Sequence, residues 1–322
     1  MFKRMLRAFG VGGPSVDTVL TNPNVRPGEL LTGEVRIAGG DHPADIDQVK
    51  LSLVTRVEVE SGDNEHNRNV EFARVVVGQR IQVGPGQHLA LPFQFPVPLE
   101  TPLTVVHGQH LHGMTMGLRT ELEVRGAVDP GDLDPIAVHP IRSQEHVLNA
   151  FGALGFRFTR ADSEQGRIHG VPQQLPFYQE IEFLPPQQFL TKISQVELTF
   201  VTDPHHLYVV LEADRRGGLF RAGGDTFGHF AMSHDEVIRT DWAAVLHQWM
   251  DQVAGRRSSH GHGMHGGHYP GHPGGHHGGH HGGHHGGGIG AGGIVAGAAA
   301  GVFGGMIVGE ALDEVGDFFE GD

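Results

Sequence analysis

The stretch from Ser15 to Gly40 constrains the fold of this chain more than any other part of its sequence. Two β-rich runs flank a polar segment, in which Arg26-Pro27-Gly28-Glu29 has the composition of a tight turn. Proline presets φ near about −65° and glycine tolerates a positive φ. In the second run the apolar residues from Leu31 to Ile37 alternate with polar ones, as in a half-buried strand. The stretch therefore predicts a hairpin with one face against a core.

The same period of two continues as far as residue 128. The further strand-like runs are 46–59, 70–83, 87–97 and 117–128, separated by segments rich in Gly, Pro, Asn and Asp. Several short strands at this spacing are typical of a β-sandwich. Pro92 and Pro96 lie within one run, which predicts an edge or bulged strand there because proline lacks the N–H that a ladder needs. Residues 1–127 are therefore predicted to form a first β-sandwich.

A second domain is predicted after a break in the pattern. Residues 128–135 contain Pro130, Gly131 and Pro135, which predict an interdomain linker. Residues 136–255 are expected to form a second β-sandwich, which opens with a helix at 142–154 and ends with a helix at 241–254. A capping box at Ser233 to Glu236 precedes that last helix, which carries both tryptophans of the chain on one face. The strand-like runs between these helices are 155–159, 177–184, 196–201, 207–213 and 227–232.

Composition limits the functions open to this chain. Its 322 residues include no cysteine, which excludes disulfides and thiol nucleophiles and points to a cytoplasmic location. A net charge of −14 at pH 7 argues against nucleic acid as a partner, because such binding needs a basic surface. The sequence contains no phosphate-binding loop, nucleophile elbow or zinc-protease motif, so we expect no enzyme and no catalytic residues. A loop with three histidines, at 107–116, fits either a metal site or an ordinary solvated loop.

Residues 256–287 form a tract of glycine and histidine that is too polar to repay the entropy of ordering, and we expect it to be disordered. Neutral imidazole is a preferred ligand of zinc, nickel and copper(II), so the tract predicts binding of these metals for storage or sensing. A soluble spacer whose charge changes near about pH 6.5 is the alternative. No cofactor is expected to be required. The candidate ligands are His260, His262, His265, His268, His272, His276, His277, His280, His281, His284 and His285.

Both ends of the chain carry patterns that suggest association. In residues 288–322 glycine recurs at every fourth position from Gly293 to Gly309, and an acidic stretch follows. Such a glycine zipper allows another helix to approach closely, so 288–309 is predicted to insert into a membrane, to self-associate into a homo-oligomer, or to pack as a linker on the protein's own domains. Residues 1–10 have apolar and basic residues at helical spacing. They predict a short helix that docks on the following domain or lies on an anionic membrane.

Several short motifs, taken together, are similar to those of a known bacterial family. The chain resembles the sporulation-control proteins of the stage-zero M type, and the resemblance covers about residues 1–254. The motifs that carry it are Phe2-Lys3-Arg4-Met5-Leu6, Val16-Asp17-Thr18-Val19-Leu20, Val25-Arg26-Pro27-Gly28-Glu29, Gly33 to Ile37 with Gly39-Gly40, Ala127-Val128-Asp129-Pro130, Leu148 to Phe158, Leu175-Pro176-Phe177 with Gln179-Glu180, and Glu212-Ala213-Asp214-Arg215.

The resemblance implies two tandem arrestin-like β-sandwiches with short helices, followed here by a low-complexity tail. It also implies a non-catalytic cytoplasmic protein that influences sporulation or cell development through contacts with protein partners of unknown identity. It transfers no catalytic residues. The histidine tract and the glycine zipper lie outside the matching motifs, so a metal-binding storage or sensing protein, associated with a membrane through its zipper, is the alternative function.

Overall fold

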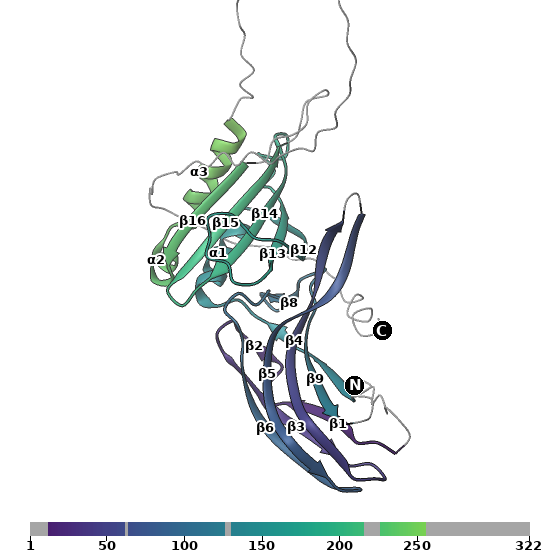
Figure 1. Cartoon of the computed structure of the whole chain (residues 1–322). Helices are drawn as coiled ribbons and strands as arrows, with labels where there is room; N and C mark the ends of the chain where they lie inside the picture. The colour runs from purple at the N-terminus through teal and green to yellow at the C-terminus, as the bar shows by residue number, and fades with distance from the viewer. Residues whose placement is uncertain (1–11, 62–63, 126–129, 216–225, 256–322) are drawn as a thin grey trace, which may run out of the picture.

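A computed structural model describes residues 12–61, 64–125, 130–215 and 226–255 (Figure 1). The first half contains β1 (Ser15–Leu20), β2 (Asn24–Val25), β3 (Leu30–Ala38), β4 (Ala44–Ser61), β5 (Asn64–Val83), β6 (His88–Pro96), β7 (Val105–Val106), β8 (Gln109–His110), β9 (Met116–Val124), β10 (Gly131–Pro135) and β11 (Ala137–Val138). The second half contains α1 (Arg142–Ala153), β12 (Arg157–Gln165), β13 (Phe177–Leu184), β14 (Ile193–Thr202), β15 (His206–Arg215), β16 (Thr226–Ser233), α2 (His234–Arg239) and α3 (Trp242–Gly255). The prediction of a mainly β fold with short helices is confirmed.

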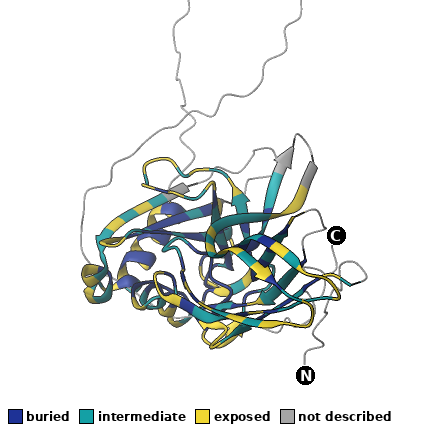
Figure 2. Ribbon diagram, turned by 60° about the horizontal axis from the view of Figure 1, so that its bottom comes forward, coloured by how far each residue is buried: buried dark blue, intermediate teal, exposed yellow. Residues whose placement is uncertain are grey.

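The first half is a sandwich of two sheets. One sheet has the order β1-β3-β6, and the other contains β10, β9, β4 and β5. Strand β1 contacts β9 and β10 of the opposite sheet, and β5 contacts β6. Leu31 and Val35 of the first sheet and Leu51 and Leu53 of the second are buried in the core between them. In Figure 2, buried residues in dark blue and exposed residues in yellow follow one another along the strands. The alternation seen in the sequence therefore corresponds to inward-facing and outward-facing side chains.

The predicted hairpin forms the start of this sandwich. Strands β1 and β3 pair antiparallel from Ser15 opposite Ala38 onward. Gly28 has a φ of 84°, and the N–H of Glu29 donates to the carbonyl of Arg26 at 3.0 Å, which closes the expected turn. Strand β6, with its two prolines, is an edge strand of the three-stranded sheet, as predicted.

The second half places one sheet against a layer of helices. Strands β12 to β16 pair antiparallel in sequence order, and α1, α2 and α3 contact one another or strands β15 and β16. Phe151 of α1 lies 4.5 Å from the ring of Phe183 on β13, and Trp242 of α3 lies 5.5 Å from Phe230 on β16. In the described part of the chain, α1, α2 and α3 thus pack on this sheet or on one another. The reason is the wide apolar stripe on α1 and α3, which covers the inner face of the sheet.

The predicted linker is partly a strand. Residues 131–135 form β10, which pairs antiparallel with β9 from Gly131 opposite Glu121 to Pro135 opposite Gly117. Proline is tolerated because β10 is the last strand of its sheet, where one row of N–H groups has no ladder partner. Strand β11 then pairs with β2 of the first half. The chain therefore leaves the first half only shortly before α1.

A single long sheet connects the two halves. Glu58 of β4 pairs in parallel with Glu164 of β12, so the strand order runs β10-β9-β4-β12-β13-β14-β15-β16. The buried apolar residues of both halves form one hydrophobic cluster. Among the described residues, no helix has the length and apolar character needed to cross a bilayer. The predictions for residues 1–10, 256–287 and 288–322 concern segments outside the described residues.

We predict that Gly33→Ala destabilises the first sandwich strongly. A Cβ at Gly33 would lie 2.5 Å from the carbonyl oxygen of Val19 and 2.9 Å from a ring carbon of Phe93, so β1 would have to move. The expected loss in the free energy of unfolding is about 2 kcal/mol or more, measured by urea titration. Gly84→Ala is the matched control, because its Cβ would lie 3.5 Å from the nearest atom. Equal stability of the two variants would contradict the close approach.

Candidate functional site

The junction of the two halves is held by a buried side-chain amide. Oε1 of Gln179 on β13 accepts from the N–H of Leu103 at 2.9 Å, and Nε2 of Gln179 donates to the carbonyl of Leu103 at 2.8 Å. Leu103 lies in the loop after β6 and is 1% exposed, and Gln179 is 8% exposed. A cavity of about 20 Å³ beside this pair is large enough for about one water molecule. The amide thus replaces a missing strand partner for the backbone of Leu103.

Further polar contacts surround this pair. The carboxylate of Glu100 accepts from the backbone N–H groups of Gln174 and Leu175 at 2.8 Å each. The N–H of Ala161 on β12 donates to the carbonyl of His112 at 2.8 Å. All of these bonds cross from the first half to the second. The bonds of Glu100 are exposed or part-buried, so the buried contact of this junction is the pair of Gln179 and Leu103.

An edge-to-face aromatic pair closes the same junction. Phe72 of β5 and Phe177 of β13 lie 5.5 Å apart with their rings at 85°. Arg26, in the first turn of the hairpin, donates to the carbonyl of Pro140 just before α1. Of the segments that carry the family resemblance, 175–180 therefore contacts the first half, and 25–29 contacts the connection that leads to α1. The sequence singled out these segments but did not indicate that they lie at an interface.

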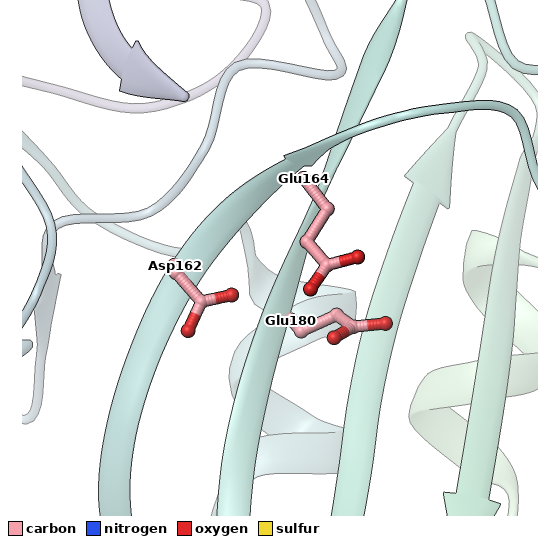
Figure 3. Close-up of side chains that lie close together, drawn as sticks. All are labelled: Asp162, Glu164 and Glu180. Carbon is pink, nitrogen blue, oxygen red and sulfur yellow. The ribbon is translucent and has the colours of Figure 1, made fainter. Parts of the chain in front are cut away.

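A cluster of carboxylates lies beside the junction, on the outer face of the second sheet. Asp162 and Glu164 of β12 and Glu180 of β13 point toward one another (Figure 3). Asp162 pairs directly with Glu180 in the ladder, and Glu164 pairs with Glu58 of β4. One carboxylate oxygen from each of the three lies within 4.8 Å of those of the other two. The cluster therefore combines residues of two strands next to the strand that joins the halves.

Burial and like charge make this cluster hold protons. Burial, together with the neighbouring Glu197 and Glu164, raises the pKa of Glu180 to about 9. Burial raises the pKa of Asp162 to about 7, although the nearby Arg160 acts in the opposite direction. Arg160 lies 3.2 Å from Asp162 and donates to Glu182 at 2.6 Å. Near neutral pH the cluster thus carries less negative charge than its composition suggests.

The chemistry of the cluster is that of a hard-cation or proton site. Carboxylate oxygens are the ligands that Ca²⁺, Mg²⁺ and Mn²⁺ prefer, and a divalent cation would relieve the repulsion between the three groups. Protonation relieves the same repulsion without a metal, and Arg160 already neutralises one side of the cluster. The alternation of β12 and β13 places these side chains outward. The sequence could not show that they meet, because the meeting depends on the register between two strands.

The histidine predictions concern two segments, of which the structure describes one. The tract from His260 to His285 lies outside the described residues. In the loop at 107–116, His107 contacts Asn149 through Nε2 at 2.5 Å, and burial lowers the pKa of His110. Within the described ranges, the acidic cluster is the one group of metal-ligating side chains close enough to share an ion.

Ser143 and His234 lie as close together as a catalytic serine and histidine would, but their contact is structural. Oγ of Ser143 lies 2.8 Å from Nδ1 of His234, and Nε2 of His234 lies 3.0 Å from the carbonyl oxygen of Asp203. A serine activated by histidine needs this kind of contact, but it must also reach a substrate. Ser143 is 2% exposed at the start of α1. The pair therefore ties α1 to α2 and to the turn before β15.

We predict that Gln179→Ala weakens the junction by about 2–4 kcal/mol, because it leaves the N–H and the carbonyl of Leu103 buried without partners. Urea unfolding of the full chain measures this loss. Gln195→Ala is the control, because the hydrogen bond of the Gln195 side chain to Glu197 lies within β14 and does not cross the junction. A loss at Gln179 no larger than the loss at Gln195 would refute the role of the amide.

We predict that Glu180→Gln changes the pH dependence of stability. The folded state raises the pKa of Glu180 from 4.5 to about 9. The stability that the protonated side chain contributes is therefore complete below about pH 4.5 and is lost as the pH rises through 9. At pH 8 the variant should be more stable than the unmodified protein by about 1–3 kcal/mol. Thermal unfolding from pH 5 to 9 tests this, with Asp214→Asn on β15 as the exposed acidic control. Parallel curves for the variant and the unmodified protein would contradict it.

The chain is similar to proteins with a known role. The model of the SpoOM protein family matches residues 2–217. The sporulation-control protein spo0M of Bacillus subtilis (strain 168) is 32% identical over 262 residues, which are 79% of this chain and 98% of that protein. The crystal structure of Spo0M from Bacillus subtilis superposes with a TM-score of 0.65 at 30% identity, over 76% of this chain and 100% of that one. Because both the family model and a relative of nearly full length match, the chain belongs to the SpoOM protein family.

Proposed function

We propose that this protein is a non-enzymatic cytoplasmic regulator of sporulation or cell development that acts through contacts with other proteins. The name of its Bacillus subtilis relative, a sporulation-control protein, supports a role in sporulation. The junction supports a non-enzymatic role, because its polar groups hydrogen-bond to one another and hold the two halves together. The serine of the Ser143–His234 pair is buried. A molecule of this kind presents surfaces to a partner and leaves the partner's covalent structure unchanged.

The open edge of the long sheet is the surface that best fits a partner strand. Strand β16 is the last in the strand order of the part of the chain described, and it spans eight residues. The N–H of His234, just after β16, donates to the carbonyl of His205 at 3.2 Å. Backbone groups alternate in direction along a strand, so those of Ala231 and His229 point away from β15. An extended peptide that pairs with these groups would continue the sheet.

The side chains at this edge also favour recognition over burial. His229 and Ala231 are exposed, whereas Phe230 and Met232, which alternate with them, are half-buried. Main-chain pairing supplies affinity in strand addition, and alternate side chains supply selectivity. His229 is thus placed to contact a side chain of the partner.

We predict that Ala231→Pro abolishes partner binding but leaves the fold intact. The proline removes one outward N–H, whereas the ladder bonds to β15 come from the neighbouring residues. Ala231→Val keeps the N–H and adds a side chain that suits a strand, so it is the matched control. Tagged variants are used to capture partners from the native host, which mass spectrometry identifies. Capture of the same proteins by both variants would exclude β16 as the binding edge, provided that both melt as the unmodified protein does.

A second candidate function rests on the histidine tract. Eleven imidazoles lie between His260 and His285, and several of them are adjacent pairs that can supply ligands without a preformed site. In this candidate the folded part carries a metal-binding tail for storage or sensing of zinc, nickel or copper. Acid would release the metal, because protonated imidazole is not a ligand.

Removal of residues 256–322 separates the two candidates. The proposed regulator predicts that the truncated chain still captures the same partners and restores the developmental phenotype of a deletion strain, with or without a chelator. The metal-binding candidate predicts loss of both, and it predicts that a chelator reproduces the loss in the full chain. Binding of Zn²⁺ to the full chain alone, measured by calorimetry, is expected in either case and does not decide between them.

A further inference from the structure

A hollow of about 400 Å³ lies on the outer face of the three-stranded sheet. It covers three successive rungs across β1, β3 and β6, in which Ser15, Ala38 and His88 form the first rung and Asp17, Arg36 and Ala90 form the third. In the rung between them, Val16 and Ile37 point into the core and are 6% and 1% exposed. The outward side chains are therefore those of the first and third rungs. Three of these side chains, those of Ser15, Ala38 and Ala90, are small. They leave a largely apolar floor, and Asp17, Arg36 and His88 form its polar rim.

The chain enters the described structure at the edge of this hollow. The N–H of Asp41 donates to the carbonyl of Gly12 at 2.9 Å, which fixes Gly12 beside the end of β3. Ser15, three residues later, already lines the hollow. The segment 1–11 is therefore joined to the rest of the chain next to the hollow. As a helix they would be about 16 Å long, which exceeds the width of about 10 Å between the outer two of three strands.

We infer that the hollow is the docking site of the chain's own N-terminal segment, residues 1–11. At the helical spacing of the sequence, Phe2, Met5, Leu6 and Phe9 would share an apolar face of that segment, and Lys3, Arg4 and Arg7 would share a basic face. The apolar face matches the floor of the hollow, which would otherwise expose apolar surface to water.

The charges at the rim match the basic face. Asp17 lies in the third rung, and Glu34 is the next outward residue along β3, where its carboxylate accepts from Nε of Arg36 at 2.7 Å. Asp41 lies at the anchor point of Gly12. Three carboxylates against one guanidinium leave this end of the sheet acidic. A basic segment held at one end is therefore attracted to it, and the short tether gives a high effective concentration.

The chain contains no cysteine, so two introduced cysteines can form a disulfide only with each other or with another copy of the chain. Ala90→Cys places one thiol in the hollow of the full-length protein. A second cysteine then replaces, one at a time, Met5, Leu6 and Phe9 of the apolar face or Lys3, Arg4 and Arg7 of the basic face. Disulfide formation requires Cβ atoms within about 4.5 Å of each other. Mild oxidation followed by non-reducing electrophoresis measures intramolecular and intermolecular products separately.

Docking predicts an intramolecular disulfide for the apolar-face positions, with a yield at least about fivefold above that of the basic-face positions. Equal yields at all six positions, or none, would overturn the inference. A covalent dimer as the main product would assign the hollow to the segment of a second copy and would also overturn it.

Vesicles of phosphatidylglycerol and phosphatidylcholine test the membrane as the competing occupant. Docking predicts that they leave the intramolecular yield unchanged. If vesicles bind the protein and lower that yield by about fivefold or more, the apolar face belongs to a membrane surface, and the inference fails. Neither result bears on β16, so the proposed function stands or falls separately.

Discussion

The pairing of the Gln179 amide with the backbone of Leu103 is the interaction on which the arrangement of the two halves depends. Leu103 is buried and lies outside the strands, and a side-chain amide offers its backbone N–H an acceptor and its backbone carbonyl a donor. Leaving those two groups unpaired would cost about 1–3 kcal/mol each. The hydrogen bonds of Glu100 and of Ala161 lie around this pair. The two halves therefore cannot separate without exposing several backbone groups at once.

The acidic cluster places a proton-sensitive element next to this junction. Glu164 pairs with Glu58, the residue of β4 through which the long sheet crosses from one half to the other. Repulsion between carboxylates at this crossing is relieved when Glu180 and Asp162 hold protons, as their raised pKa values of about 9 and about 7 indicate. The first half shows the opposite arrangement, since Lys50 contacts Glu123 and Arg74 contacts Glu71 on the outer face of its sheet. These carboxylates of the first half are thus paired with cations, whereas those of the cluster in the second half mainly face one another.

Sequence periodicity accounts for most of the elements but for few of the contacts between them. The alternation from Leu31 to Ile37, the turn at Gly28 and the capping box at Ser233 each depend on neighbouring residues, and the structure contains all three. The strand at 131–135 was missed because its prolines look like breaks unless the strand lies at an edge. The helices at 142–154 and 241–254 were predicted from their apolar stripes, but a stripe does not reveal which residues it packs against.

The candidate site depends on sequence-distant pairs, which no local pattern shows. Gln179 and Leu103 are 76 positions apart, and the pairing of Asp162 with Glu180 depends on a register shift near Phe158 in β12. Resemblance to a family did mark the segment at 175–180, although it gave no reason for the match. In the structure this segment carries both the amide at the junction and one carboxylate of the cluster.

If the junction holds the two halves together as described, they unfold as one cooperative unit. Differential scanning calorimetry of the full chain measures this. We expect a single heat-absorption peak whose calorimetric enthalpy equals its van't Hoff enthalpy, because neither half keeps its buried polar groups paired alone. Two resolved peaks, or a calorimetric enthalpy well above the van't Hoff value, would show instead that the halves unfold independently.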